Sequence, residues 1–354
     1  MNGSSPASPD VLIVGAGIAG LALARALRDA GRRALVLERS SGVGGRCATR
    51  RIDGVPVDHG APFAHGRTPE FLAAIASAAE GRIAGWPHAC VGEGFPCHPE
   101  ALLDGHTTSA WRDGQTRLPK SIADGCEMRL GARVTALDAS RGTGRVGVTL
   151  ESGERIEAAS VVLAMPGPQA LGLTETLGPG EPATSRASTV LGLPRYMACL
   201  AAIARYAPGT EPPDWEACYP GHTTALHAAY HDSSKRAPGS PVTLVFHARP
   251  GFSRERMNDA DPNRWAAEML AEAASAHGAW IATPRELHTH VWKHARVAPG
   301  TGVAGPALLP LENGATLGLC GDGFHPSGGL EGAFLSARML AGRLTGIDTG
   351  FTRI

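Results

Sequence analysis

The chain has 354 residues, enough for two domains or for one domain with a large insertion. Its 33 basic residues balance its 33 acidic residues, so no overall field attracts nucleic acid or an anionic membrane. The hydrophobic fraction of 43% excludes extended disorder. The seven cysteines are an odd number without a Cys-x-x-Cys pair, which favours buried reduced thiols over a disulfide framework or a zinc ribbon. The spacing of the histidines predicts no metal site.

The polar start of the chain carries no basic region typical of a signal peptide. The longest apolar stretch, residues 11–24, is interrupted by three glycines and is too short for a membrane span. We therefore expect a cytoplasmic protein without a membrane partner.

A dinucleotide-binding pattern of the NAD(P) type follows the start of the chain. Residues 11–14 predict a buried parallel strand, which leads directly into Gly-x-Gly-x-x-Gly. Gly15 permits the tight turn, Gly17 lets the backbone approach a pyrophosphate, and Gly20 allows the next helix to pack closely on the strand. That helix is expected to end near residue 31, before a second strand at 34–37. Glu38 then ends this strand, where its carboxylate is predicted to accept hydrogen bonds from a ribose 2′-OH.

A second glycine loop favours FAD over NAD as the cofactor. Arg39 follows the acidic residue, and Gly44, Gly45 and Arg46 come shortly afterwards. Adjacent glycines before an arginine suit a longer dinucleotide, whose pyrophosphate and ribityl chain run past the first motif.

These motifs resemble those of a known family. Residues 38–39, 44–46 and 57–63 are similar to the start of the FAD-dependent amine oxidase superfamily, and closest to its renalase-like branch. Residues 161–169, 292–297, 319–324 and 329–336 resemble later segments of the same branch. The resemblance covers roughly residues 10–66, 111–170 and 288–344. It implies an α/β fold in which a Rossmann-like FAD-binding domain is interleaved with a mixed α+β substrate domain.

The last of these segments forms a closing cofactor motif. Residues 316–320 predict a strand, and the Asp322 carboxylate that follows Gly321 is placed for the ribityl hydroxyls. Apolar residues at helical spacing predict a helix over 330–344, whose positive end favours the charge of reduced flavin. The resemblance also implies that the backbone of Val134 meets adenine. The complete predicted set of cofactor-binding residues is Gly15, Gly17, Gly20, Glu38, Arg39, Gly45, Arg46, Val134, Gly321, Asp322, Gly329, Leu330, Glu331 and Gly332.

The remaining patterns give a coarse organisation. Thr68 and Pro69 predict the start of a helix, and Asp261 with Pro262 predict another. Strands are expected at 129–137, 146–150 and 161–164, and antiparallel strands at 197–203 and 242–247. Residues 173–190, rich in Gly, Pro, Thr and Ser, predict a crossing between domains. The predicted domains are an FAD-binding domain at 10–90, 111–172 and 288–345, and a substrate domain at 91–110 and 173–287.

The resemblance implies hydride transfer from a small reduced substrate, such as a dihydro-NAD(P) isomer, to flavin N5, with O₂ reoxidising the flavin to give H₂O₂. Such a donor needs no general base. Lys235 is the one candidate for the lysine that amine oxidases place near N5, but its surroundings predict an exposed loop. The predicted catalytic residues are Trp292, His59 and His325. A pathway-specific amine oxidase or desaturase and a non-catalytic flavin-binding protein are the alternatives, and the sequence leaves the oligomeric state open.

Overall fold

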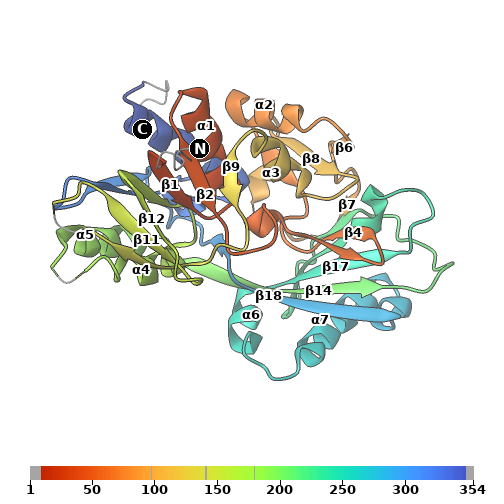
Figure 1. Ribbon diagram of the computed structural model, residues 1–354. Helices are drawn as coiled ribbons and strands as arrows, with labels where there is room; N and C mark the ends of the chain where they lie inside the picture. The colour runs from red at the N-terminus through yellow and green to blue at the C-terminus, as the bar shows by residue number, and fades with distance from the viewer. Residues whose placement is uncertain (1–8, 97, 140–141, 179, 348–354) are drawn as a thin grey trace. The chain divides into compact units, whose positions relative to one another are not determined.

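The computed structural model describes residues 9–96, 98–139, 142–178 and 180–347, which form two compact units (Figure 1). The described residues at 9–45, 119–139, 142–178, 180–195 and 297–347 form the first unit, and those at 46–96, 98–118 and 196–296 form the second. Each unit is therefore discontinuous in sequence, as expected for interleaved domains. These units divide the chain at different residues from the predicted domains. The predicted domain boundaries stay a prediction, because packing alone does not tell which residues hold a cofactor.

The first unit contains a six-stranded sheet in the order β19-β20-β13-β1-β2-β9. The strands are β1 (Val11–Val14), β2 (Ala34–Leu37), β9 (Glu127–Arg129), β13 (Ser160–Leu163), β19 (Ala307–Pro310) and β20 (Thr316–Leu319). All neighbouring pairs are parallel except β19 with β20. Helices α1 (Ile18–Asp29) and α8 (Gly329–Thr345) pack against one another. Side chains at both faces of the apolar strands are buried, as a doubly covered parallel sheet requires.

A three-stranded antiparallel sheet and two helices complete the first unit. They are β10 (Val134–Asp138), β11 (Val146–Leu150), β12 (Arg155–Ala158), α4 (Gly167–Thr174) and α5 (Pro182–Leu191). The predicted single strand over 129–137 is wrong, because Gly131, at φ +67°, turns the chain between β9 and β10. The predicted crossing at 173–190 stays a prediction with the other domain boundaries. Part of this stretch is helical: α5 begins after Glu181, which caps it by accepting a hydrogen bond from the Ala183 N–H.

The second unit is organised around another six-stranded sheet, in the order β18-β14-β17-β16-β15-β7. Its strands are β7 (Cys90–Val91), β14 (Tyr196–Arg205), β15 (Ala217–Cys218), β16 (Leu226–His231), β17 (Thr243–Ala248) and β18 (Glu286–Val297). The predicted strands at 197–203 and 242–247 are confirmed as the antiparallel pair β14 and β17. The helices and 3₁₀ turns that accompany this sheet are η3 (Asp232–Lys235), α6 (Pro250–Arg256), α7 (Pro262–His277) and η4 (Ala279–Ala282).

Two small sheets occupy the rest of the second unit. One pairs β3 (Thr49–Ile52) with β4 (Val55–Asp58), and the other has the order β5-β8-β6. Its members are β5 (Ala64–Gly66), β6 (Arg82–Ala84) and β8 (Thr107–Trp111). The short helices and turns nearby in sequence are η1 (Gly45–Cys47), α2 (Pro69–Ser77), η2 (Pro99–Leu102) and α3 (Arg117–Ile122), and η5 (Asp322–Phe324) follows β20. Among the described residues, none of the helices combines the length and apolar character that crossing a bilayer demands.

Candidate functional site

The glycine turn of the first unit has the shape that a pyrophosphate requires. Gly15 has φ +109°, and a Cβ there would lie 2.7 Å from the Ala164 carbonyl oxygen. A Cβ on Gly20 would lie 1.9 Å from the Gly15 oxygen, so α1 packs against the turn as the motif predicts. A Cβ on Gly17 would instead meet no atom within 4 Å. The turn therefore leaves open space in front of Gly17, at the first turn of α1, where amide N–H groups favour an anion.

Glu38 is held at the end of β2 by two backbone amides. Its carboxylate accepts hydrogen bonds from the N–H groups of Ala16 and Ser40, each at 2.8 Å. A carboxylate has about four lone-pair sites, so acceptor capacity remains for ribose hydroxyls. The second glycine loop adjoins the first, since Gly44 N–H donates to the Ala16 oxygen at 2.8 Å and a Cβ on Gly45 would lie 3.5 Å from the Gly17 Cα. The geometry of this part of the unit fits a dinucleotide.

The closing segment of the first unit is fixed by one buried serine. Ser336 Oγ on α8 donates to the Gly321 oxygen at 2.9 Å and accepts from the Gly321 N–H at 3.1 Å. Gly321 has φ +147°, and the Asp322 side chain that follows is buried. The predicted residues Gly329, Leu330, Glu331 and Gly332 form the first turn of α8. This arrangement brings the late part of the predicted cofactor set into the same unit as the glycine turn, together with Val134 at the start of β10.

His325 lies in this closing segment. Its Nδ1 accepts a hydrogen bond from the Ser327 N–H at 3.3 Å, and a Cβ on Gly332 would lie 3.3 Å from its Cβ. Burial lowers its pKa, although nearby Glu331 opposes that shift. His325 belongs to the first unit, whereas the other two predicted catalytic residues belong to the second.

In the second unit, Arg46 is tied to two other segments. Its guanidinium donates to the Ala295 oxygen at 3.3 Å, and its own carbonyl accepts from the Ala61 N–H at 2.8 Å. A Cβ on Gly60 would lie 2.1 Å from the same carbonyl oxygen. The glycine of the segment at 57–63 is therefore required by close packing against the Arg46 backbone.

The structure brings the predicted residues His59 and Trp292 together. Trp292 Nε1 donates to the His59 oxygen at 3.0 Å, and the ring centroids of the two residues are 5.4 Å apart. His290 joins them, with centroids 5.0 Å from His59 and 4.3 Å from Trp292. His247 Nε2 lies 3.3 Å from the His59 oxygen. We call these four residues the ring cluster.

His247 and His290 were missed by the sequence-based prediction. The alternation of His288, His290, Trp292 and His294 along β18 is a signal that would have found one of them, because residues two apart share a face of a strand. His247 carries no such signal. Every residue of β17 is buried, so no alternation of exposed and buried positions distinguishes this histidine.

The imidazoles of the ring cluster are neutral at neutral pH. Burial, with help from His290 and Arg50, lowers the pKa of His59 to about 4. Burial lowers the pKa of His247 to about 3 and also lowers that of His290. His59 Nδ1 is buried without a hydrogen-bond partner among the described residues. The cluster is thus an uncharged, aromatic surface.

This burial predicts a specific loss of stability in mild acid. An unfolded His59 takes up a proton near pH 6.5 and the folded one only near pH 4, so stability present above pH 6.5 is lost as the pH falls towards 4. The loss from this residue is on the order of 3 kcal/mol. Urea unfolding followed by tryptophan fluorescence across this pH range should show a shallower dependence in His59→Gln. His222→Gln, at a side chain that is 94% exposed, should keep the wild-type dependence, and equal slopes in all three proteins would contradict the assignment.

A buried cluster of charged side chains includes Asp58, the residue before His59. Asp58 and Asp232 pair with Lys235 and Arg236, with contacts of 2.7 Å and 2.8 Å from Lys235 Nζ to the two carboxylates and of 2.8 Å from Arg236 Nη2 to each. Burial alone would raise the pKa of Asp58, but the two cations lower it far below its usual range. The expectation that Lys235 lies in an exposed loop is wrong: its side chain is fully buried, because two carboxylates and the Pro62 oxygen bind its ammonium group.

The comparisons with known proteins give the class to which this fold and these motifs belong. Residues 13–76 match the model of the NAD(P)-binding Rossmann-like domain, and residues 85–345 match that of the flavin containing amine oxidoreductases. The second match covers well over half of the chain, so the protein belongs to the family of flavin-containing amine oxidoreductases. The expected FAD cofactor, the oxidoreductase class and membership of the amine oxidase superfamily are confirmed at this level.

Individual relatives match over shorter stretches. AofH of Mycobacterium tuberculosis, named as a flavin-containing monoamine oxidase, is 47% identical over 72 residues, which are 20% of this chain and 16% of AofH. Polyamine oxidase 2 of Arabidopsis thaliana is 44% identical over 59 residues, 17% of this chain and 12% of that protein. The matched region is thus less than a fifth of each relative's length.

Solved structures match across nearly the whole chain. A putrescine oxidase variant superposes with a TM-score of 0.71 at 16% identity, covering 96% of this chain and 99% of its own. Cyclohexylamine oxidase from Brevibacterium oxydans gives a TM-score of 0.68 at 17% identity, with the same coverage. These similarities confirm the predicted fold class.

Proposed function

We propose that the protein is a renalase-like FAD oxidoreductase that removes a hydride from a small, already reduced substrate, with dihydro-NAD(P) isomers as the candidate class and O₂ as the terminal acceptor. Bound FAD supplies the hydride acceptor. The observation that carries the proposal is the state of the ionisable groups of the second unit. The ammonium group of Lys235 is paired with two carboxylates, and the imidazoles of the ring cluster are weak bases.

An amine must lose a proton before it can be oxidised. An aliphatic amine is protonated in neutral water, and its oxidation by hydride loss requires the free amine, so a site for it benefits from a base whose pKa lies near the working pH. A group with a pKa of about 4, as His59 has, is a poor acceptor for an ammonium proton. A dihydropyridine is a strong hydride donor without losing a proton first. The uncharged ring cluster is also compatible with a flat heteroaromatic ring.

Each part of the proposal has named residues. The backbone of Gly15, Gly17 and Gly20 binds the pyrophosphate, and Glu38 binds a ribose. Asp322 binds the ribityl chain. We propose that Trp292 and His59 contact the substrate and that their two uncharged rings orient it. The catalytic role predicted for His325, which belongs to the first unit, is a separate part of the proposal. The predicted domain assignment is part of the same proposal.

An anaerobic reduction screen tests the proposed substrate class. FAD-loaded protein is mixed without oxygen with 2- and 6-dihydro-NAD(P) isomers, with ordinary NAD(P)H, and with mono- and polyamines, while the visible flavin absorbance is followed. We expect rapid bleaching by the isomers and none by the amines on the same timescale. Admission of O₂ should restore the absorbance with formation of one H₂O₂ per flavin reduced. Bleaching by amines alone would refute the proposed substrate class.

The second candidate function is that of a pathway-specific amine oxidase or desaturase. It is favoured by the relatives named as monoamine and polyamine oxidases and by the fold shared with putrescine oxidase. The screen distinguishes it by which donor bleaches the flavin. A flavin that no donor reduces would point to the non-catalytic alternative.

Trp292 is expected to affect the rate of flavin reduction more than the stability of the protein. Trp292→Phe keeps an aromatic ring but removes the hydrogen bond to the His59 oxygen, so both rings lose their fixed orientation. Misplacement of a reactant by about 1 Å costs up to about 100-fold in rate, and we expect a fall of at least tenfold. Trp280→Phe is the matched control, because Trp280 packs edge-on against Tyr206 in another part of the same unit. Equal rates in the two variants would remove Trp292 from the proposed site.

A further inference from the structure

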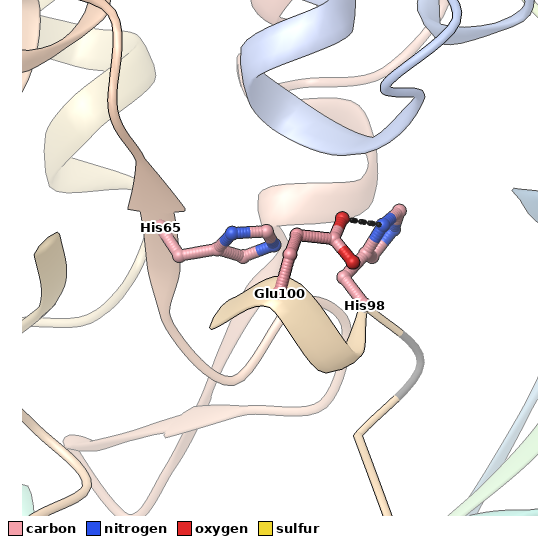
Figure 2. A group of neighbouring side chains, drawn as sticks. All are labelled: His65, His98 and Glu100. Carbon is pink, nitrogen blue, oxygen red and sulfur yellow. Dashed lines mark hydrogen bonds and ion pairs between the residues drawn. The ribbon is translucent and has the colours of Figure 1, made fainter. Parts of the chain in front are cut away.

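Three potential metal ligands of the second unit lie together in a place that the proposed function does not use. They are His65 on β5, His98 immediately before η2, and Glu100 within η2. One potential ligand atom from each residue lies within 4.8 Å of the other two. Figure 2 shows the three side chains converging, with the Glu100 carboxylate drawn between the two imidazoles. His98 and Glu100 are close in sequence, but His65 comes from a distant segment, so no simple sequence spacing reveals all three.

The distances are close to those of a coordinated ion. Bonds of about 2.0–2.1 Å in a tetrahedral zinc site place neighbouring ligand atoms roughly 3.3 Å apart. His98 Nδ1 and Glu100 Oε1 are 3.1 Å apart. The ring centroids of His65 and His98 are 5.3 Å apart. All three ligand atoms lie within 4.8 Å of one another. His65 therefore needs to move towards the pair by no more than about 1.5 Å to reach the zinc-site spacing of about 3.3 Å.

The donor set selects the kind of ion. Two imidazole nitrogens and one carboxylate oxygen suit Zn²⁺ far better than Ca²⁺ or Mg²⁺, which prefer oxygen ligands. All three residues are half-buried, so solvent can fill a fourth position. A further imidazole lies nearby: the ring centroid of His106 is 5.7 Å from that of His65, and its Nδ1 is buried without a hydrogen-bond partner among the described residues.

We infer that His65, His98 and Glu100 bind one Zn²⁺ ion through three protein ligands and one water. The ion links β5 to η2 and so cross-links two segments that are far apart in the sequence. Because the unfolded chain does not hold these ligands together, binding adds to the stability of the second unit. This inference revises the sequence-based expectation of no metal site, and it is independent of the substrate proposed above.

The test measures zinc binding to the full-length, FAD-loaded protein prepared without a histidine tag. Metal is removed with a chelator, the protein is dialysed, and Zn²⁺ is titrated in competition with a fluorescent zinc indicator. Wild type should bind one equivalent. His65→Ala and Glu100→Gln should each weaken binding at least about 100-fold, the upper end of what is lost when a residue that only orients a ligand is changed.

His88→Ala is the matched control. His88 Nδ1 lies 3.1 Å from Glu216 Oε2, the same histidine–carboxylate contact, but the described residues place no third ligand beside it. Its affinity for zinc should equal that of wild type. Flavin content and circular dichroism establish that each variant is folded. Should His65→Ala not fold, Glu100→Gln on the 3₁₀ turn carries the test.

X-ray absorption at the zinc edge gives a second, independent measurement. The loaded wild type should show the outer-shell scattering of two imidazoles, and His65→Ala should show that of fewer. Affinity unchanged in both ligand variants, no saturable site in wild type, or a spectrum without imidazole scattering would each overturn the inference. The binding measurement does not depend on turnover. A failure to bind zinc therefore leaves the proposed function unaffected, and a failure of the reduction screen leaves the proposed zinc site unaffected.

Discussion

Gly17→Val is expected to give a folded protein that has lost its flavin. Gly17 has an extended backbone with φ −78°, which valine adopts, and a Cβ there meets no atom within 4 Å. The added side chain instead fills the space that the turn leaves for a pyrophosphate. We expect the ratio of bound flavin to protein, read from the visible and ultraviolet absorbance, to fall at least about tenfold, equivalent to about 1.4 kcal/mol of binding. Circular dichroism should match that of wild-type apoprotein.

The control for this prediction is Gly172→Val in α4 of the same unit. Gly172 also has no atom within 4 Å of an added Cβ, but it is an exposed helical position away from the motif. It should keep the full flavin content. Gly17→Ala should lie between wild type and valine, because the obstruction grows with the side chain. Wild-type flavin content in Gly17→Val would show that the cofactor does not approach this turn.

Asp58→Asn is expected to cause the largest loss of stability of any isosteric change in the second unit. The substitution leaves Lys235 and Arg236 buried with Asp232 as their one remaining carboxylate. Removing one partner of a buried ion pair costs about 3–5 kcal/mol, because a charge is left uncompensated in the interior. Thermal unfolding should shift down by about 10 °C for a unit of this size. All six tryptophans lie in this unit, so tryptophan fluorescence reports its unfolding.

Two further variants make the result specific. Asp53→Asn removes the same charge from an exposed carboxylate that pairs with Arg205, and it should unfold close to wild type. Asn also tolerates the positive φ of Asp53. Asp58→Asn combined with Lys235→Met removes one charge of each sign and should recover part of the lost stability. If Asp58→Asn unfolds like Asp53→Asn, the buried pairing does not stabilise the unit.

The dinucleotide end of the fold was predictable because its signal is local. The strand, the three glycines, the helix and Glu38 occupy one continuous stretch. Gly15 and Gly20 are required by close backbone contacts, and Gly17 leaves the open space that the motif implies. The closing segment was predictable for the same reason, since the turn at Gly321 and the helix after it are neighbours in sequence. A pattern of turns and periodicity is sufficient where the contacts are short-range.

The side-chain clusters of the second unit could not be predicted because their contacts are long-range. The sequence around Lys235 is polar and contains Pro and Gly, which is typical of a surface loop. The side chain is buried only because Asp58, far away along the chain, supplies an opposite charge. The same holds for His247 beside His59 and for His98 beside His65. A single sequence contains the residue types of these clusters but not their proximity.

The interleaving of the two units has a consequence for synthesis on the ribosome. Strand β20, the turn with Asp322 and helix α8 are translated after the whole second unit, whereas the glycine turn is translated before it. The sheet of the first unit therefore stays incomplete while the second unit is being made, although its opening strand has long emerged. Nascent chains halted before residue 316 should carry no bound flavin, however much FAD the cell contains.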